Sequence, residues 1–395
     1  MSKKIIVSGV GCCLVDILYS NIDFLSPTFQ KYRSLERGNG GLTPGQLVFN
    51  EEFVQFAGAP FETLIRSITC GRTPDKINIG GPSIVSLIHA AQMSDCDTCE
   101  VRFYGKAGND QTGKYLKDAL AKTPVVLHDF TLNENITPST VVLSDPNYDN
   151  GHGERTFINS IGAAWDYKPE HLDEAFFKSD IVVFGGTALV PEIHDGLTEL
   201  LKKAKANGSM TIVNTVYDFR NEKQNPDKKW PLGNSDESFA YIDLLIADQE
   251  EALRLSGETT TEAATLFFIN KKVSAFIITN GSNPILVFSN GKLFENMELT
   301  KYAVSQRIVD ELKTNKTGDT TGAGDNFVGG VIASLMNQLK AENKILSLQE
   351  AALWGVVSGG YACFYMGGTY FEQSSGEKLN NIKPYYESYK QQLNG

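Results

Sequence analysis

Short apolar segments alternate with helix-like segments along most of this 395-residue chain. The apolar runs that resemble buried strands lie at residues 5–10, 101–104, 180–184, 211–214, 244–246, 275–279 and 285–288. Helix-like spacing of apolar residues follows at residues 112–122 and 192–206. Because parallel strands are joined by crossovers that are usually helices, this alternation predicts an α/β fold with a mainly parallel sheet covered on both faces.

Two regions lack this alternation. Residues 18–60 are rich in polar and aromatic side chains, and residues 126–165 contain two strand-like segments around a turn-rich loop, which is typical of a hairpin. We expect the two regions to form a small β-rich lid. The large domain would then comprise residues 1–17, 61–125 and 166–395. Two surface excursions with no shared role remain the alternative.

Composition excludes several classes of protein. Hydrophobic residues make up 41% of the chain and charged residues 21%, as in ordinary globular proteins. The formal net charge of -11 argues against nucleic acid and membrane surfaces as partners, because both are polyanionic. No apolar stretch approaches the ~18 residues of a membrane span. Polar breaks in the first apolar run argue against a signal peptide, so we expect a cytoplasmic protein.

Residues 318–325 have the sequence Gly-Asp-Thr-Thr-Gly-Ala-Gly-Asp, and a strongly apolar helix pattern follows them. The first turn of a helix leaves backbone N–H groups without intrahelical partners, and small residues let an anion approach them. Gly322, Ala323 and Gly324 could therefore form an anion hole for a phosphoryl group. Asp325 could accept the proton of an attacking hydroxyl group. A plainer interpretation is a glycine-rich loop whose Asp favours the helix dipole.

The complete string resembles the C-terminal signature of the ribokinase-like (PfkB) sugar and nucleoside kinases. The resemblance implies a ribokinase-like, Rossmann-type three-layer α/β/α domain with a small β-sheet lid. It implies that Asp325 is the catalytic base and that Gly322, Ala323 and Gly324 form the anion hole. It also implies a monovalent cation, K⁺, beside Asp319 and Thr321.

Other positions extend the resemblance over most of the chain. By resemblance, substrate would be bound by Asp16, Gly80, Gly81 and Arg155 together with Asp325. The nucleotide would be bound by Thr279, Gly281, Gly322 and Gly324, and Glu251 would order Mg²⁺ through water. The implied cofactors are therefore ATP, Mg²⁺ and K⁺.

Three positions depart from the family pattern. Asp248 replaces the usual Asn of an NxxE motif, and Pro284 stands where a second Gly often follows the TxG turn. Val85 occupies a position where sugar kinases commonly have a substrate-binding Asn. The last change leaves the identity of the substrate open without affecting phosphoryl transfer.

The resemblance implies a phosphotransferase that uses an alcohol group as acceptor. We expect it to move the γ-phosphoryl group of ATP to a primary hydroxyl of a sugar, bound in the cleft under the lid. Residues 326–330 and 155–164 also resemble adenosine kinase, so a nucleoside is the second candidate. A catalytically silent ligand-binding sensor on the same fold is a third. An edge strand of the lid would favour a homodimer.

Two rival motifs fail on single residues. Gly9 and Gly11 begin a dinucleotide-binding GxGxxG pattern, but Leu14 stands where its third Gly is required. Residues 108–114 fit GxxxxGK, yet Tyr115 follows where a P-loop needs Ser or Thr. A Rossmann dehydrogenase and a P-loop NTPase are therefore disfavoured.

Overall fold

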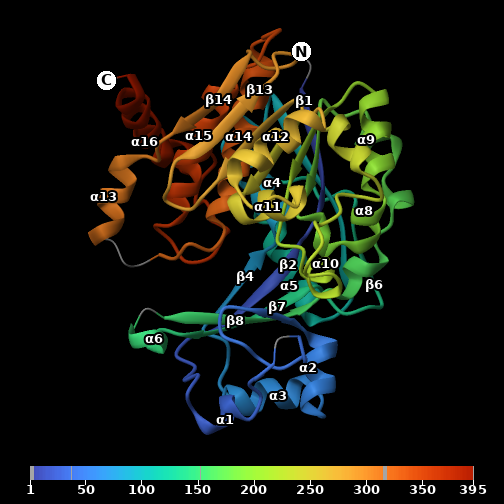
Figure 1. The fold of residues 1–395 in the computed structure, drawn as a ribbon, viewed down its shortest axis with the longest axis vertical. Coiled ribbons are helices and arrows are strands. Elements are labelled where there is room, and N and C mark those ends of the chain that lie inside the picture. Colours follow the sequence, from blue (N-terminus) through green and yellow to red (C-terminus); the bar gives the residue numbers. More distant parts are fainter. Residues whose placement is uncertain (1–3, 37, 152, 315–317, 395) are drawn as a thin grey trace.

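The computed structural model describes residues 4–36, 38–151, 153–314 and 318–394. Its larger sheet has the strand order β14-β13-β12-β11-β10-β9-β1-β5-β6 (Figure 1). The strands are β1 (Ile5–Gly11), β5 (Cys99–Gly108), β6 (Phe130–Asn133), β9 (Ile181–Gly185), β10 (Met210–Asn214), β11 (Leu244–Asp248), β12 (Ala275–Thr279), β13 (Ile285–Ser289) and β14 (Met297–Tyr302). The seven strands from β12 through β1 and β5 to β6 pair in parallel. β13 and β14 are added in antiparallel pairing at the β12 edge. The predicted, mainly parallel sheet is confirmed.

Helices cover both faces of this sheet. One buried cluster joins the sheet to α4 (Pro82–Gln92), α5 (Gln111–Leu120), α13 (Gln306–Thr314), α14 (Ala323–Lys340), α15 (Leu348–Ala362) and α16 (Glu377–Asn394). A second cluster joins the other face to α7 (Glu174–Phe177), α8 (Pro191–Asp195), α9 (Leu197–Ala206), α11 (Gln249–Ser256) and α12 (Thr261–Asn270). α10 (Phe219–Gln224) follows β10, and short 3₁₀ helices lie at Gly162–Asp166, Pro169–His171, Thr187–Leu189 and Asp236–Tyr241. The arrangement is a three-layer α/β/α domain.

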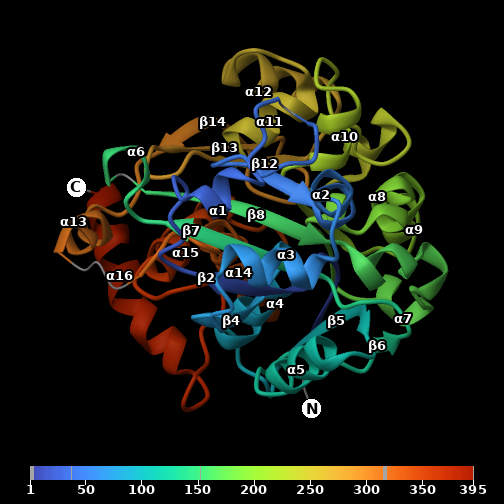
Figure 2. The ribbon, with the colours of Figure 1, turned by 90° about the horizontal axis from the view of Figure 1, so that it is seen from below.

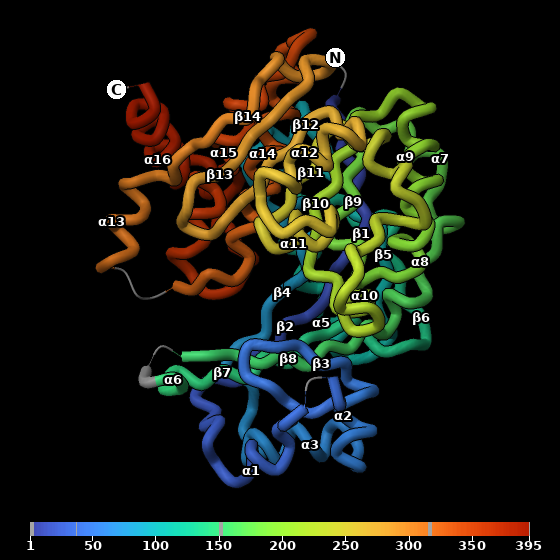
Figure 3. The backbone as a smooth tube through the Cα atoms, viewed as in Figure 1, coloured from blue at the N-terminus to red at the C-terminus, as the bar shows by residue number. Residues whose placement is uncertain are grey.

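A smaller sheet forms the lid, with the strand order β3-β8-β7-β2-β4. Its strands are β2 (Leu14–Tyr19), β3 (Leu47–Phe49), β4 (Lys76–Gly80), β7 (Ser139–Asp145) and β8 (Glu154–Ser160). β7 and β8 pair antiparallel around the short helix α6 (Tyr148–Gly151), which confirms the expected hairpin. In Figure 3 the chain crosses between the two parts of the molecule at β2 and β4, and Figure 2 views the molecule from the lid side.

The lid sheet uses residues outside the expected ranges. β2 begins at Leu14 and β4 ends at Gly80, although both segments lie partly or wholly in the ranges expected for the large domain. Conversely, β6 pairs with β5 of the larger sheet, although it lies in a range expected for the lid. The physical reason is that strand pairing across the sheet, rather than local composition, decides where each segment belongs.

The region expected to be β-rich at residues 18–60 is mostly irregular where it is described, and its strands are only β3 and the end of β2. It contains α1 (Pro27–Gln30) and α2 (Asn50–Ala57), and α3 (Phe61–Ile68) follows it. These helices bury Phe29, Phe53 and Leu64 in a separate hydrophobic cluster against the lid strands. Short helices with a few large apolar residues lack the length that makes 3.6-residue periodicity visible in a sequence.

The expected helix at residues 192–206 is two helices, α8 and α9, which meet at Gly196. A Cβ atom built on Gly196 would lie 2.8 Å from Cγ of Pro169, so the break coincides with a close approach to a neighbouring segment. No helix in the part of the chain that the structure describes is long and apolar enough to cross a membrane.

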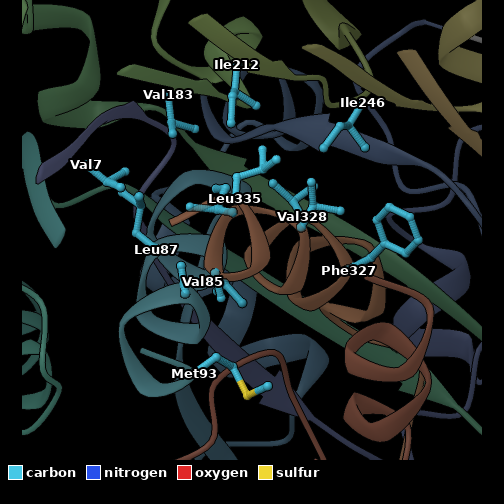
Figure 4. Close-up of a cluster of buried hydrophobic side chains, with 14 of the residues drawn as sticks. Val7, Val85, Leu87, Met93, Val183, Ile212, Ile246, Phe327, Val328 and Leu335 are labelled. Atoms are coloured by element: carbon cyan, nitrogen blue, oxygen red, sulfur yellow. The ribbon is translucent and has the colours of Figure 1, made fainter. Parts of the chain in front are cut away.

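Helix α14 packs against α4 and α15 at the centre of one buried cluster (Figure 4). Val328 and Leu335 lie on the side of α14 that faces the sheet, whereas the ring of Phe327 lies against Gly355 of α15. A Cβ atom on Gly329 would lie 2.5 Å from the carbonyl oxygen of Ser86, and one on Gly330 would collide with the hydroxyl of Ser358. Both glycines therefore lie where α14 comes very close to a neighbouring helix, Gly329 to α4 and Gly330 to α15.

Candidate active site

Asp16 lies on β2, at the point where the chain leaves the larger sheet for the lid. It is paired with Asn78 on β4 and with Thr140 on β7. A Cβ atom built on Gly80 would collide with Oδ2 of Asp16. Gly80 is therefore required for the Asp16 carboxylate to lie against β4.

Gly81 follows Gly80 and precedes the first residue of α4. Its backbone has φ +105°, and a Cβ atom there would lie 2.6 Å from the carbonyl oxygen of Cys12. Only glycine adopts this conformation at such a close approach without strain. The Gly-Gly pair thus packs the start of α4 against the connection between β1 and β2, next to Asp16.

Residues 318–325, called the signature segment below, have one packed side and one open side at the start of α14. Gly322 precedes the helix with φ +74°, and a Cβ atom on it would collide with Cα of Gly368. In contrast, nothing lies within 4 Å of the position of a Cβ atom on Gly324. Among the described residues, no side chain forms an N-terminal capping hydrogen bond to α14. The N–H of Ala323 donates to the carbonyl oxygen of Thr320 at 3.2 Å, whereas the open space at Gly324 leaves that part of the first turn accessible to an anion.

Asp325 lies in the first turn of α14 and is half-buried. Burial raises the pKa of this carboxyl to about 6. Burial, and then the negative charges of Asp325 and Asp319, raise the pKa of Asp16 to about 7. The charges of Asp325 and Asp319 thus act on Asp16, although the three residues come from distant segments of the chain.

Glu251 lies in the first turn of α11, which begins at the carboxyl end of β11. Its Oε2 accepts hydrogen bonds from the hydroxyl of Thr215 at 2.5 Å and from the backbone N–H of Asp248 at 3.0 Å. Burial, followed by the charge of Asp248, raises the pKa of Glu251 to about 7, and the charge of Asp325 contributes. The Glu251 carboxyl is thus buried at the carboxyl end of β11, within electrostatic reach of Asp325.

Asp248, which departs from the family's Asn, acts as the N-cap of α11. Its Oδ1 accepts the backbone N–H of Glu251 at 2.8 Å. On the adjacent strand it is paired with Thr279, the last residue of β12. Gly281 follows with φ +55°, and nothing lies within 4 Å of a Cβ position there. The residues expected to bind nucleotide and magnesium therefore share one edge of the sheet.

Arg155, on lid strand β8, reaches the signature segment. Its Nη1 donates a hydrogen bond to the hydroxyl of Thr321 at 2.9 Å, and its Nη2 lies 3.6 Å from Oδ2 of Asp319. Oδ1 of Asp319 accepts the backbone N–H groups of Thr321 at 2.9 Å and Gly367 at 3.2 Å. The side chains expected beside a monovalent cation are thus in contact with the lid arginine.

The site offers few side chains that could bind a magnesium ion directly. No group of three or more His, Cys, Asp or Glu side chains gathers as a metal site within the described ranges. Mg²⁺ in kinases is typically held by one or two carboxylates, by water and by substrate phosphates. The buried Glu251 carboxyl therefore fits a role through water, with phosphate oxygens completing the coordination.

Sequence reasoning missed several residues of the pocket between lid and signature segment. The pocket is lined by Asp16, Leu18, Lys76, Asn78, Val142, Arg155, Phe157, Asp319, Thr321, Met366 and Gly367. Lys76 donates from Nζ to the carbonyl oxygen of Met366. Nδ2 of Asn78 is buried without a hydrogen-bond partner. Lys76, Asn78 and Gly80 alternate along β4, so recognition of that strand would have placed all three on one face.

Comparison with known proteins identifies a family. The model described as pfkB family carbohydrate kinase matches residues 76–373. The chain is 25% identical over 296 residues to ribokinase of Haemophilus influenzae, which covers 72% of this chain and 83% of that protein. It is 25% identical over 253 residues to adenosine kinase 1 of Arabidopsis thaliana, which covers 60% of this chain and 66% of that protein.

Solved structures share the fold. Ribokinase from Thermotoga maritima superimposes with a TM-score of 0.62 at 18% identity, covering 97% of this chain and 99% of that one. Adenosine kinase from Schistosoma mansoni in complex with 2-fluoroadenosine gives a TM-score of 0.67 at 21% identity, covering 93% and 97%. A putative ribokinase II of E. coli in complex with ATP and Mg²⁺ gives 0.62 at 18% identity, covering 98% and 99%. The ribokinase-like fold and its lid were thus predicted correctly.

Proposed function

The chain belongs to the pfkB family of carbohydrate kinases, and we propose that it transfers the γ-phosphoryl group of ATP to a primary hydroxyl group of a sugar. Proteins of this family are phosphotransferases that act on hydroxyl groups. The observation that carries the proposal is the placement of Asp325 beside the open N–H groups of α14, within electrostatic reach of Asp16.

Asp325 is the proposed general base. With a pKa of about 6, its carboxyl is mostly ionised at neutral pH and can accept the proton of the acceptor hydroxyl. The hydroxyl oxygen then forms a bond to the γ-phosphorus, the bond from that phosphorus to the β,γ-bridging oxygen breaks, and ADP leaves. Asp16 would orient a second hydroxyl of the acceptor, because its carboxylate oxygens accept hydrogen bonds.

Charge that develops on the transferred group needs donors that are already in place. The N–H groups of Gly322, Ala323 and Gly324 would supply them, and the close packing of Gly322 against Gly368 holds the start of α14 in place. Thr279 and Gly281 would contact the nucleotide phosphates. Mg²⁺, when bound, neutralises phosphate charge, and Glu251 would orient its water ligands.

A nucleoside is the second candidate acceptor, and Val85 is the observation that favours it. Val85 is buried on α4, where a Cβ atom built on Gly368 would contact its Cγ1 at 3.2 Å. An apolar side chain there offers no hydrogen bond to a sugar hydroxyl. A silent sensor is disfavoured, since binding alone does not require a base next to an open anion hole.

A panel assay tests the proposal. ADP release would be measured with ATP, Mg²⁺ and separate sugars and nucleosides, with Asp325→Asn as the control. We expect release that depends on one class of acceptor and is lost in the variant. Release that is independent of any acceptor, or its absence with every acceptor, would contradict kinase activity.

Two further parts of the proposal concern the lid and the cation. The lid sheet ends in β3 on one side and β4 on the other, and Ile77 of β4 is 42% exposed. An exposed edge strand with an apolar side chain favours pairing with a second lid, so we expect a homodimer. Sedimentation of wild type and Ile77→Lys would test it, with a shift to monomer expected for the variant. K⁺ beside Asp319 and Thr321 is tested by the salt comparison described below.

A further inference from the structure

The C-terminal helix α16 begins beyond residues 76–373, the segment that matches the family model. It packs against α15, α13 and α4, and it lies at the outer edge of the large domain (Figure 1). Lys378, in its first turn, is nevertheless only 1% exposed. A lysine ammonium is strongly hydrated, so its burial is unfavourable unless the protein supplies acceptors. The contacts of Lys378 therefore indicate what it does.

Lys378 bonds to neutral amide oxygens. Its Nζ donates to Oδ1 of Asn326 at 2.9 Å and to Oε1 of Gln92 at 3.2 Å. The same atom lies 5.7 Å from the ring centroids of Tyr365 and of Tyr370, which gives cation–π attraction. Oε1 of Glu372 accepts the backbone N–H of Lys378 at 2.8 Å. Burial lowers the pKa of the lysine to about 7, and the charge of Glu372 opposes this.

Asn326 follows Asp325 directly and is completely buried. Its Nδ2 donates to the carbonyl oxygen of Gly322 at 2.8 Å and to that of Gly368 at 2.8 Å. These carbonyl groups belong to the two segments that touch where Gly322 enters α14. The Asn326 side chain thus holds the start of α14 to the segment behind it.

A carboxamide can be rotated by half a turn, so its orientation must be specified by its partners. An ammonium group only donates hydrogen bonds, so Lys378 requires the oxygen of Asn326 on its side. The hydroxyl of Tyr365 also contacts Oδ1 at 3.1 Å, but a hydroxyl can donate or accept and does not distinguish the two orientations. In the flipped orientation, Oδ1 would face two carbonyl oxygens and Nδ2 would face the ammonium, and both arrangements repel.

We infer that Lys378 is a positioning residue for the anion hole, because its buried Nζ, as a hydrogen-bond donor to Oδ1, fixes the orientation of Asn326 and thereby the backbone of Gly322 at the start of α14. The inference rests on the proposed function, in which the N–H groups of Gly322, Ala323 and Gly324 stabilise the transferred group. If Lys378 no longer holds Asn326, the N–H groups of the anion hole lose their fixed positions. Because these groups stabilise the transition state, the loss lowers kcat more than it raises KM.

The kinetic test compares variants of α16. Lys378→Met keeps most of the aliphatic stem and removes the donor, whereas Lys378→Gln keeps an N–H donor without the charge. Tyr386→Phe is the matched control, because Tyr386 is also on α16 but is away from residues 318–325. Its hydroxyl donates to Oε1 of Glu350 on α15 at 2.5 Å, and the variant removes this bond. We expect kcat to fall about tenfold or more in Lys378→Met with KM changed by less than about threefold, and to recover partly in Lys378→Gln. Wild-type kcat in Lys378→Met, or an equal loss in Tyr386→Phe, would overturn the inference.

Hydrogen exchange gives a second readout that needs no substrate. Amide exchange of residues 318–327 would be followed in wild type, Lys378→Met and Tyr386→Phe, with β10 as an internal reference. We expect exchange of that segment to rise several-fold in Lys378→Met alone. Unchanged exchange would overturn the inference even if the kinase reaction itself is not found, so failure of the two proposals can be distinguished. If Lys378→Met does not fold, Lys378→Gln is compared with Tyr386→Phe in the same way.

Discussion

Arg155 on the lid and Thr321 in the signature segment are joined by a 2.9 Å hydrogen bond from the guanidinium to the hydroxyl. The two residues lie 166 positions apart in the chain. The same guanidinium lies 3.6 Å from the carboxylate of Asp319. The lid is therefore held against the loop that starts α14, over the pocket that contains Asp16. In the proposed reaction, closure of this kind would exclude water from the transferred phosphoryl group.

Replacement of Arg155 by Met should weaken this closure. We expect kcat for the acceptor to fall about tenfold and the ratio of ATP hydrolysis to acceptor phosphorylation to rise, because water enters a less enclosed site. Both products would be quantified in one reaction. Arg307→Met, which removes an arginine paired with Glu311 on α13, is the control and should leave the ratio unchanged.

Asp325→Asn should lower kcat by about 100-fold or more, because the amide cannot accept the proton of the attacking hydroxyl. Steady-state rates with saturating ATP and acceptor would measure this. Circular dichroism should show an unchanged fold, since the isosteric amide keeps the packing of α14. Near-normal turnover in the folded variant would end the assignment of Asp325 as the base.

Stability should fall as pH rises from about 4 to about 7, because Asp325 and Asp16 have folded-state pKa values of about 6 and about 7. Carboxyl groups in unfolded chains titrate near ~4, so between these values the folded state binds more protons and loses stability as they leave. Asp16→Asn should therefore be more stable than wild type at pH 8, on the order of 1–3 kcal/mol.

The difference should shrink toward pH 4, where the wild-type carboxyl is protonated in the folded state. Thermal melts at both pH values would measure it, with Glu258→Gln as a control at an exposed carboxylate. A wild type that is more stable than Asp16→Asn at pH 8 would contradict the raised pKa of Asp16.

Activity should rise when K⁺ replaces a bulky organic cation at equal ionic strength, if Asp319 and Thr321 bind a monovalent ion. Initial rates in the two salts would measure the effect, and equal rates would remove the cation site. Arg155 supplies a positive charge at the same residues. Repeating the comparison in Arg155→Met separates the charge of K⁺ from that of the guanidinium. Without the guanidinium, the rate should depend more strongly on K⁺.

Part of the fold could be predicted because it depends on local pattern. The apolar runs of β9, β10 and β12 are bounded by turn residues and are buried on both faces, which is typical of parallel strands. In contrast, β4 was missed because Ile77 is exposed and Lys76 and Asn78 are polar, so the segment lacks a strand-like apolar run.

The sequence by itself determined most of the central sheet and the start of α14, and it is the basis of the chemistry proposed for residues 318–325, because strand and helix periodicity and first-turn N–H groups are properties of neighbouring residues. The tertiary structure alone decided which distant residues meet this segment. Asp16 comes from β2, Arg155 from β8 and Lys378 from α16, 52 positions from its partner Asn326. Such contacts depend on the path of the chain between elements, which local patterns do not encode.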